Sequence, residues 1–131
     1  MLMNRKGFTL IELIMVIVLL GLLAIVAIPK YYDLQKDAKL ASDKGVIGGV
    51  RAGIYTYFAK NKAYPGTLGG SKDDCSATNP CFSTVLDQGG IQENWICTTA
   101  GLVYTGASGT VANGGVGTCT YTPATGAFLC A

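Results

Sequence analysis

The chain has 131 residues, half of them hydrophobic, with 18 Gly, five Cys and no His. One small domain of this length has a modest core, so we expect disulfide staples and an oxidising compartment such as the bacterial periplasm or cell surface. The missing His removes the commonest catalytic base and metal ligand, which argues against an enzyme and against a metal or other cofactor. The net charge of +2 comes from Arg5 and Lys6, because setting these aside leaves eight of the ten basic side chains against eight acidic ones. No nucleic-acid partner is therefore expected.

A short basic leader precedes a long apolar run. Met1–Lys6 carries both excess positive charges, so it is expected to stay on the cytoplasmic side of a membrane. The run from Phe8 to Ile28 is long enough to span a bilayer as a helix, and Glu12 is its one charged residue. A secretory signal peptide is disfavoured, because the run is too long and no small-x-small cleavage site lies near Pro29. A plain membrane anchor is the better alternative, but it leaves Glu12 unexplained.

The stretch Gly7-Phe8-Thr9-Leu10-Ile11-Glu12-Leu13 resembles the N-terminal signal of type IV pilins and of type II secretion pseudopilins. The resemblance implies that a prepilin peptidase cleaves between Gly7 and Phe8 and that the new Phe8 amine is N-methylated. Cleavage would create a cation four residues before Glu12. In an assembly this carboxylate can neutralise the Phe8 amine of a neighbour, because two charges buried together cost much less than either alone. We therefore expect Phe8 and Glu12 to be assembly residues without a catalytic role.

Pro29 lies at the end of the apolar run. Proline lacks an N–H and its ring clashes with the preceding turn, so a helix end or a kink is predicted here. A bend suits the point where the chain leaves the membrane, and we assign Pro29 to assembly for that reason. The family resemblance further implies that the stretch from Gly21 to Pro29 loses helicity in a filament.

From Lys30 onward charged residues of both signs appear, and the helix is expected to continue to about Lys60. Charged residues such as Asp33, Lys36 and Asp43 are assigned to a solvated face. Apolar residues recur at steps of three or four, which is typical of a helix with one face toward a core. These residues are Leu40, Val46, Ile47, Val50, Ile54, Tyr57 and Phe58.

Four glycines fall inside this predicted helix, at Gly45, Gly48, Gly49 and Gly53. Each weakens a helix by roughly 0.8–1 kcal/mol relative to Ala. A merely weaker helix is one interpretation. Close approach of a sheet or of another subunit to the helix is the one we favour.

Residues 61–94 have successive turn signals and are predicted to be an irregular connector. Cys75 and Cys81 lie six positions apart and are predicted to form a disulfide. Zinc is the alternative, but it would need a His or a second nearby pair of Cys. Four acidic residues of the connector could bind calcium, as acidic loops do in some secretion pseudopilins, but their spacing does not match an EF-hand and a solvated loop is favoured. They are Asp73, Asp74, Asp87 and Glu93.

No charged side chain follows Glu93. Strand-like segments at 101–105, 110–112, 118–122 and 127–130, separated by Gly-rich turns, predict a small antiparallel meander.

A hairpin loop at 123–126 would place Cys119 opposite Cys130. A disulfide between them is predicted, and it would resemble the C-terminal disulfide-bounded region of type IV pilins. Cys97 stays unassigned: it is free and then buried or modified, or it pairs with one of these two.

The predicted fold class is α+β, with one long N-terminal α-helix packed on a small antiparallel β-sheet, as the resemblance to pilins implies. The expected segments are a leader over 1–7 and a hydrophobic transmembrane or filament-core helix over 8–29. An amphipathic helical half over 30–60 and a head of loops and strands over 61–131 follow.

The resemblance implies a structural subunit of a type IV pilus. Such a subunit is single-pass in the bacterial inner membrane before assembly and then a homopolymeric extracellular filament. Its expected partners are the prepilin peptidase and the inner-membrane assembly machinery. The alternative is a type II secretion pseudopilin in a short periplasmic pseudopilus. Similarity of the stretch from Pro29 to Ala38 to mannose-sensitive haemagglutinin pilins favours the pilus.

The sequence favours two other classes of function less. An anchored enzyme or thiol-redox protein would need a nucleophile–base pair or a Cys-x-x-Cys motif, and the sequence has neither. The other class is an anchored binding domain that does not assemble. The chargeless C-terminal region is either an ordinary low-charge sheet or a surface for subunit contacts, cell adhesion or glycosylation.

Overall fold

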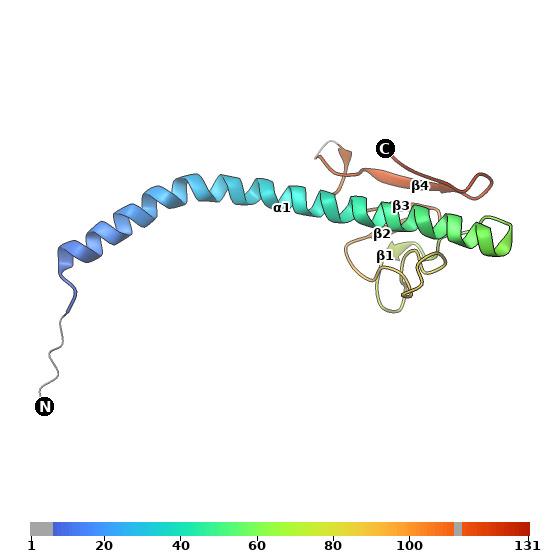
Figure 1. Cartoon of the computed structure of the whole chain (residues 1–131), viewed down its shortest axis with the longest axis horizontal. Coiled ribbons are helices and arrows are strands. Elements are labelled where there is room, and N and C mark those ends of the chain that lie inside the picture. The colour runs from blue at the N-terminus through green and yellow to red at the C-terminus, as the bar shows by residue number, and fades with distance from the viewer. Residues whose placement is uncertain (1–6, 112–113) are drawn as a thin grey trace, which may run out of the picture. The chain divides into compact units, whose positions relative to one another are not determined.

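A computed structural model describes residues 7–111 and 114–131 of the chain, so the predicted leader over Met1–Lys6 lies outside the described residues. These described residues form one helix and five strands (Figure 1). The chain divides into two units, Met1–Gln35 and Lys36–Ala131. The predicted α+β class is confirmed. The elements are α1 (Leu10–Asn61), β1 (Asp73–Asp74), β2 (Ile96–Thr99), β3 (Val103–Thr105), β4 (Thr118–Thr122) and β5 (Ala127–Cys130).

Helix α1 begins at Leu10, close to the predicted start at Phe8, and ends at Asn61, close to the predicted end at Lys60. It continues through Pro29, so of the two outcomes predicted at this proline, a helix end or a kink, the helix end is wrong. One proline removes a single backbone donor, and helix propagation through the residues on both sides outweighs that loss. At the C-terminal end, Lys62 takes a left-handed φ of 58° and its N–H donates to the carbonyl of Phe58 at 2.8 Å.

The five strands form one antiparallel sheet in the order β1-β2-β3-β4-β5, so each strand pairs with its neighbours in sequence. Cys119 pairs with Cys130 and Thr122 with Ala127, which is the register expected from a loop at 123–126. Gly126 closes that loop with a φ of 67°, and its N–H donates to the Thr122 carbonyl at 2.9 Å. Glycine suits this position because side chains disfavour the left-handed region.

The strand predicted at 110–112 is wrong for Thr110 and Val111, and Ala112 lies outside the described residues. Gly109 and Gly114 turn the backbone here, with φ values of 76° and 77°. Strands β1 and β2 were not predicted. The first is two residues inside an otherwise irregular connector, and the second begins just after it.

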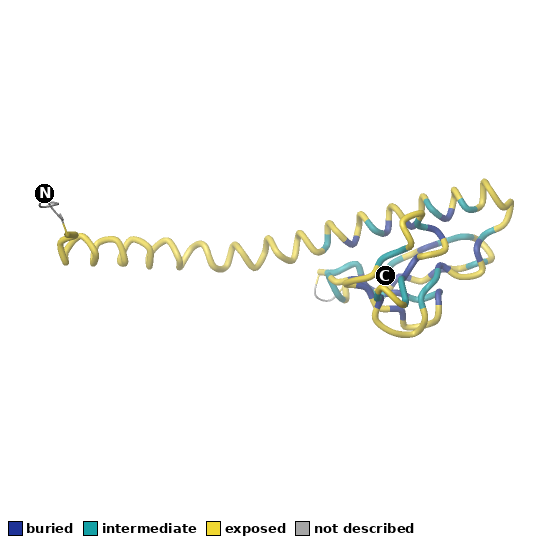
Figure 2. The backbone as a smooth tube through the Cα atoms, turned by 90° about the horizontal axis from the view of Figure 1, so that it is seen from below, coloured by how far each residue is buried: buried dark blue, intermediate teal, exposed yellow. Residues whose placement is uncertain are grey.

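The buried stripe of α1 lies in the second unit and is contributed by Ile47, Val50 and Ile54. These residues follow the three- and four-residue steps predicted from the sequence. They join the sheet residues in one hydrophobic core. Figure 2 shows buried segments in this half of α1 and in the strands and loops packed against it.

Four aromatic rings fill the middle of this core. The ring of Phe82 lies 4.2 Å from that of Tyr104, 5.2 Å from Trp95 and 5.7 Å from Phe128, measured between centroids. Edge-to-face pairs add about 0.5–1.5 kcal/mol beyond area burial. Phe82 and Tyr104 are both fully buried, so the loop that carries Phe82 is fixed to the sheet.

The glycines of α1 differ in what surrounds them. A Cβ placed on Gly53 would overlap the carbonyl oxygen of Val85, and one on Gly49 would lie 3.9 Å from Leu86. A Cβ on Gly45 or Gly48 would meet nothing within 4 Å. Close approach to the helix is therefore confirmed for Gly53, although its neighbour is a loop and not a strand.

Asp43 is buried, with only 1% of its surface exposed, so its assignment to the solvated face is wrong. Position 43 precedes Ile47 by four residues and lies on the same buried stripe. Its carboxylate accepts hydrogen bonds from the backbone N–H of Ser108, at 2.8 Å, and from the Ser108 hydroxyl. The N–H of Val116 in turn donates to that hydroxyl oxygen at 3.2 Å. Asp43 thus holds a chargeless loop against α1.

We predict opposite stability changes for two Gly→Ala substitutions in α1. Gly53→Ala should destabilise the head, because overpacking against Val85 costs about 1–3 kcal/mol and outweighs the gain in helix propensity. Gly45→Ala should stabilise it by up to about 1 kcal/mol, since the new methyl group enters open space. Urea unfolding of the full chain in detergent, followed by Trp95 fluorescence, measures both. Equal effects at the two positions would contradict the close approach at Gly53.

We also predict that Asp43→Ala costs more stability than Asp37→Ala, an exposed change on the same helix. Loss of the carboxylate leaves the donors of Ser108 without an acceptor, at about 1–3 kcal/mol for each buried group. Asp43→Asn keeps one acceptor oxygen and should cost less than Asp43→Ala. Thermal unfolding of the three variants gives the order, and an Asp43→Ala protein as stable as Asp37→Ala would refute this role.

Candidate functional site

None of the described residues of the first unit is buried: every position from Gly7 to Gln35 is exposed (Figure 2). Exposure reaches 87% for Phe8 and 71% for Ile25. A soluble monomer rarely leaves so large an apolar surface in water. Within the described part of the chain, α1 is the one helix long and apolar enough to cross a membrane. This surface requires a lipid or protein partner.

Thr9 and Glu12 form the start of α1. The hydroxyl oxygen of Thr9 accepts the N–H of Glu12 at 3.4 Å, and the Thr9 carbonyl accepts the N–H of Leu13 at 3.3 Å. Thr-x-x-Glu at a helix start is the capping-box pattern, and a carboxylate in the first turn is favoured by the helix dipole. The structure shows one half of that pattern, the bond from the Glu12 backbone N–H to the Thr9 hydroxyl, which was not predicted although Thr9-Leu10-Ile11-Glu12 was the signal for it.

Gly7 and Phe8 lie before the helix, and both are exposed. The peptide bond between them is thus outside regular secondary structure. The structure brings Phe8 and Glu12 to the same end of α1, whereas Pro29 lies inside the helix near the end of the apolar run.

Two disulfides staple the head, Cys75–Cys81 and Cys119–Cys130. The first closes a six-residue separation within the connector, and the second joins β4 to β5. Cys97 is the free cysteine and is 1% exposed. Its sulfur lies 3.2 Å from the Thr99 carbonyl and accepts the N–H of Gly101 at 3.3 Å.

Two buried tyrosines tie the sheet to the segment that follows α1. The hydroxyl of Tyr104 donates to the Gly69 carbonyl at 2.5 Å, and that of Tyr121 donates to the Pro65 carbonyl at 2.7 Å. Burial raises the pKa of Tyr104 and also that of Tyr121. Both hydroxyls therefore stay protonated as donors to a higher pH than the hydroxyl of an exposed tyrosine.

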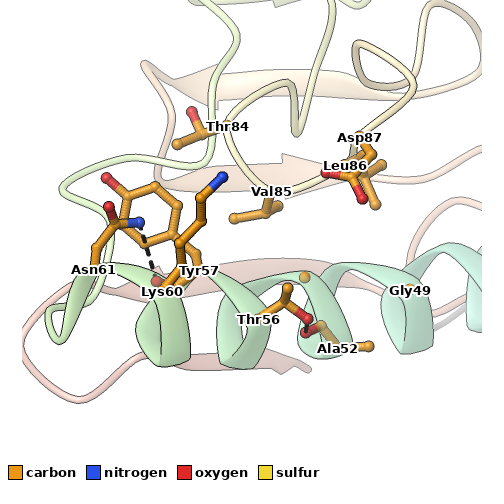
Figure 3. A pocket seen from close by; sticks show the side chains of 11 residues that line it. Gly49, Ala52, Thr56, Tyr57, Lys60, Asn61, Thr84, Val85, Leu86 and Asp87 are labelled. Atoms are coloured by element: carbon orange, nitrogen blue, oxygen red, sulfur yellow. Dashed lines mark hydrogen bonds between the residues drawn. The ribbon is translucent and has the colours of Figure 1, made fainter.

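A groove of about 610 Å³ lies between the last turns of α1 and the loop at 84–87 (Figure 3). Two polar side chains of its wall are satisfied by the helix itself. Thr56 donates to the Ala52 carbonyl and Asn61 to the Tyr57 carbonyl, both at 3.0 Å. The described residues that line the groove provide no nucleophile–base pair.

The acidic residues of the connector are dispersed. Asp73 and Asp74 lie on β1, Asp87 lines the groove of Figure 3, and Glu93 lines a separate hollow. Over residues 7–111 and 114–131, no three His, Cys, Asp or Glu side chains gather where they could hold a metal ion.

The described structure thus combines an exposed apolar helix, which has a capped and carboxylate-bearing start, with a head that two disulfides cross-link. The family model of the prokaryotic N-terminal methylation motif matches residues 2–28. A type IV narrow pilus major component PilA5 of Thermus thermophilus is 35% identical over 91 residues, which cover 64% of this chain and 78% of that protein. The chain belongs to the family of type IV pilins and type II secretion pseudopilins.

Two further relatives match about half of this chain. Type II secretion system core protein G of Pseudomonas aeruginosa is 39% identical over 51% of this chain and 47% of its own length. Fimbrial protein EcpC of Eikenella corrodens is 34% identical over 47% of this chain and 40% of its own length. The chain thus spans less than half the length of these two relatives. No solved structure matches the chain significantly.

We predict that the Cys97 thiol is protected in the folded head. Its burial should block alkylation by iodoacetamide under native conditions, and one thiol per chain should react after unfolding without reduction. Thr98→Cys is the matched control, because residue 98 is exposed on the same strand and its thiol should react while the head is folded. Mass spectrometry counts the modified sites. Rapid native labelling of Cys97 would contradict its buried position.

Proposed function

We propose that this chain is a structural pilin, not an enzyme, which polymerises through α1 into an extracellular type IV pilus. The observation that carries the proposal is the uncovered apolar surface of residues 10–34, most of which lies within the methylation motif matched over residues 2–28. Bundling of such helices removes this surface from water, at roughly 25 cal/mol per Å² buried. Before assembly the same surface is covered by lipid, as a single span of the bacterial inner membrane.

Processing is the first proposed step. The prepilin peptidase cleaves between Gly7 and Phe8, removes the leader over 1–7 and exposes the Phe8 amine for N-methylation. The match of the methylation motif to residues 2–28 supports this step, as does the exposure of both residues before the helix. The mature chain then consists of the hydrophobic helix over 8–29, its amphipathic continuation over 30–60 and the head over 61–131.

Glu12 and Phe8 are proposed to pair between neighbouring subunits during assembly. The Phe8 amine is a cation inside an apolar bundle, and a neighbour's carboxylate is the counter-charge that lowers the cost of burying it. The inner-membrane assembly machinery would bring the subunits together. Pro29 is proposed to permit local loss of helicity in the filament.

A pseudopilin of type II secretion is the second candidate, favoured by the similarity to core protein G of Pseudomonas aeruginosa. It would form a short periplasmic pseudopilus from the same helix. The relative that is aligned over most of its length is a pilus component by its name. For that reason we place the surface pilus first.

The test compares Glu12→Ala with Glu12→Gln, expressed with a pilus assembly machinery. Glutamine retains a capping-box side chain but has no charge, so both variants should lose filaments if charge pairing drives assembly. We expect at least a tenfold drop of the chain in the sheared extracellular fraction, equivalent to about 1.4 kcal/mol or more, while membrane insertion persists.

Loss of filaments in Glu12→Ala alone would assign Glu12 to capping and contradict charge pairing. Filaments from the unaltered chain in the sheared fraction are the expected sign of a pilus. Their confinement to the periplasm would favour the pseudopilus, and a monomeric membrane protein would refute polymerisation altogether.

A further inference from the structure

A groove of about 360 Å³ lies in the head between α1 and the outer edge of β5, and its charged residues are both basic. We call it the basic groove. Gly48 forms an open part of its wall, because a Cβ there would meet nothing within 4 Å. The residues that line the groove are Lys44, Ile47, Gly48, Arg51, Val116 and Cys130.

Lys44 and Arg51 are exposed, and they lie on the same side of α1, seven positions apart. The Arg51 Nε–H donates to the Phe128 carbonyl at 3.0 Å, which fixes the guanidinium beside β5. Across the described residues, neither side chain forms an ion pair. The groove therefore presents two cations without a counter-charge.

The opposite edge of the sheet carries the opposite charge. Strand β1 consists of Asp73 and Asp74 alone, and both residues are exposed. We call this strand the acidic edge. Within the described part of the chain neither carboxylate has an ion-pair partner, although Lys72 is adjacent in sequence and Lys39 lines the same hollow as Asp74. No charged residue follows Glu93, so the rest of the sheet offers no competing counter-charge.

The sheet order places β1 and β5 at opposite edges, and Figure 1 shows β1 and β4 on opposite sides of α1. The acidic edge therefore cannot enter the basic groove of its own chain. It can enter the groove of a second copy.

We propose that the basic groove receives the acidic edge of a neighbouring copy of this chain, Asp73 and Asp74 lying against Lys44 and Arg51. The proposal rests on the polymerisation proposed above and names the contact between heads. Each copy uses two different surfaces, so the contact is heterologous. Heterologous contacts extend a fibre when the rotation between copies does not close a ring.

The chemistry of the side chains suits this contact. With its Nε bound to Phe128, the Arg51 guanidinium still has Nη donors available for a carboxylate, and Lys44 adds a point charge. Exposed ion pairs contribute little stability each. Their larger effect is on register, because juxtaposed like charges disfavour the wrong alignment.

The test reverses each surface separately and then together in the full chain. Lys44→Glu with Arg51→Glu makes the groove acidic, and Asp73→Lys with Asp74→Lys makes the edge basic. Each change alone should lower sheared filament about tenfold, whereas the combined variant should recover to within about twofold of the unaltered chain. Co-expression of the two altered chains should also restore filaments, since each surface then meets its complement on the other chain.

Lys60→Glu is the matched control, because it reverses a charge on the same helix outside the basic groove. It should leave filament yield unchanged. Melting temperatures of all variants identify any that fail to fold. Undiminished filaments from the folded chain with both Lys44→Glu and Arg51→Glu, or no recovery in the combined and mixed samples, would overturn this contact. In both cases the unaltered chain would still form filaments, so the proposed function would stand.

A cross-link provides a measurement that keeps all four charges. Gly48→Cys and Ser71→Cys place thiols in the groove and beside the acidic edge. Oxidation of filaments with copper phenanthroline should then give a ladder of covalent oligomers that needs both substitutions. Only monomers in filaments that contain both cysteines would also overturn the contact.

Discussion

The uncovered apolar surface of α1 is the constraint on which the other properties of this protein depend. Between Leu10 and Leu34 the helix has large apolar side chains that no other part of the described chain covers. Such a helix needs lipid or other copies of itself, so isolation in water is not a stable state for it. A carboxylate at its start is then costly in every apolar environment unless a counter-charge or a backbone donor compensates it. The favourable helix dipole at this end of α1 and the proposed pairing with Phe8 both lower that cost.

The head has to be stable with the small amount of core that remains. Only three apolar residues of α1, Ile47, Val50 and Ile54, are buried. The aromatic cluster around Phe82 and the two disulfides compensate for this small contribution. Disulfides matter most where a short chain buries little surface. Asp43 adds a polar contact between α1 and the loop that carries Ser108.

Much of this arrangement could be predicted from local patterns. The steps between Ile47, Val50 and Ile54 identified the buried face of α1, because helical period and burial agree there. The length of the loop at 123–126 fixed the register of β4 and β5, since a hairpin loop allows few pairings. The methylation motif could be identified from the order of residues around Gly7 and Glu12 alone.

The features that escaped prediction depend on tertiary neighbours. Asp43 counted as a surface charge because the sequence does not show that Ser108, far along the chain, supplies its donors. The strand at 110–112 failed because glycines on both sides turn the backbone. The basic groove depends on sheet order, which places Cys130 beside Lys44 and Arg51 and sends Asp73 to the other edge.

The apolar surface of α1 and the charged surfaces of the head have different physical consequences for a polymer. Apolar burial is strong but non-directional, so helices with apolar side chains on every face can slide or rotate against one another at little cost. Ion pairs between folded heads add little stability, but they constrain the alignment of neighbouring subunits. A filament built from this chain would therefore owe its cohesion to the apolar half of α1, and the register of its subunits to contacts between heads. Because the sheet beyond Glu93 is chargeless, that register would depend on very few residues.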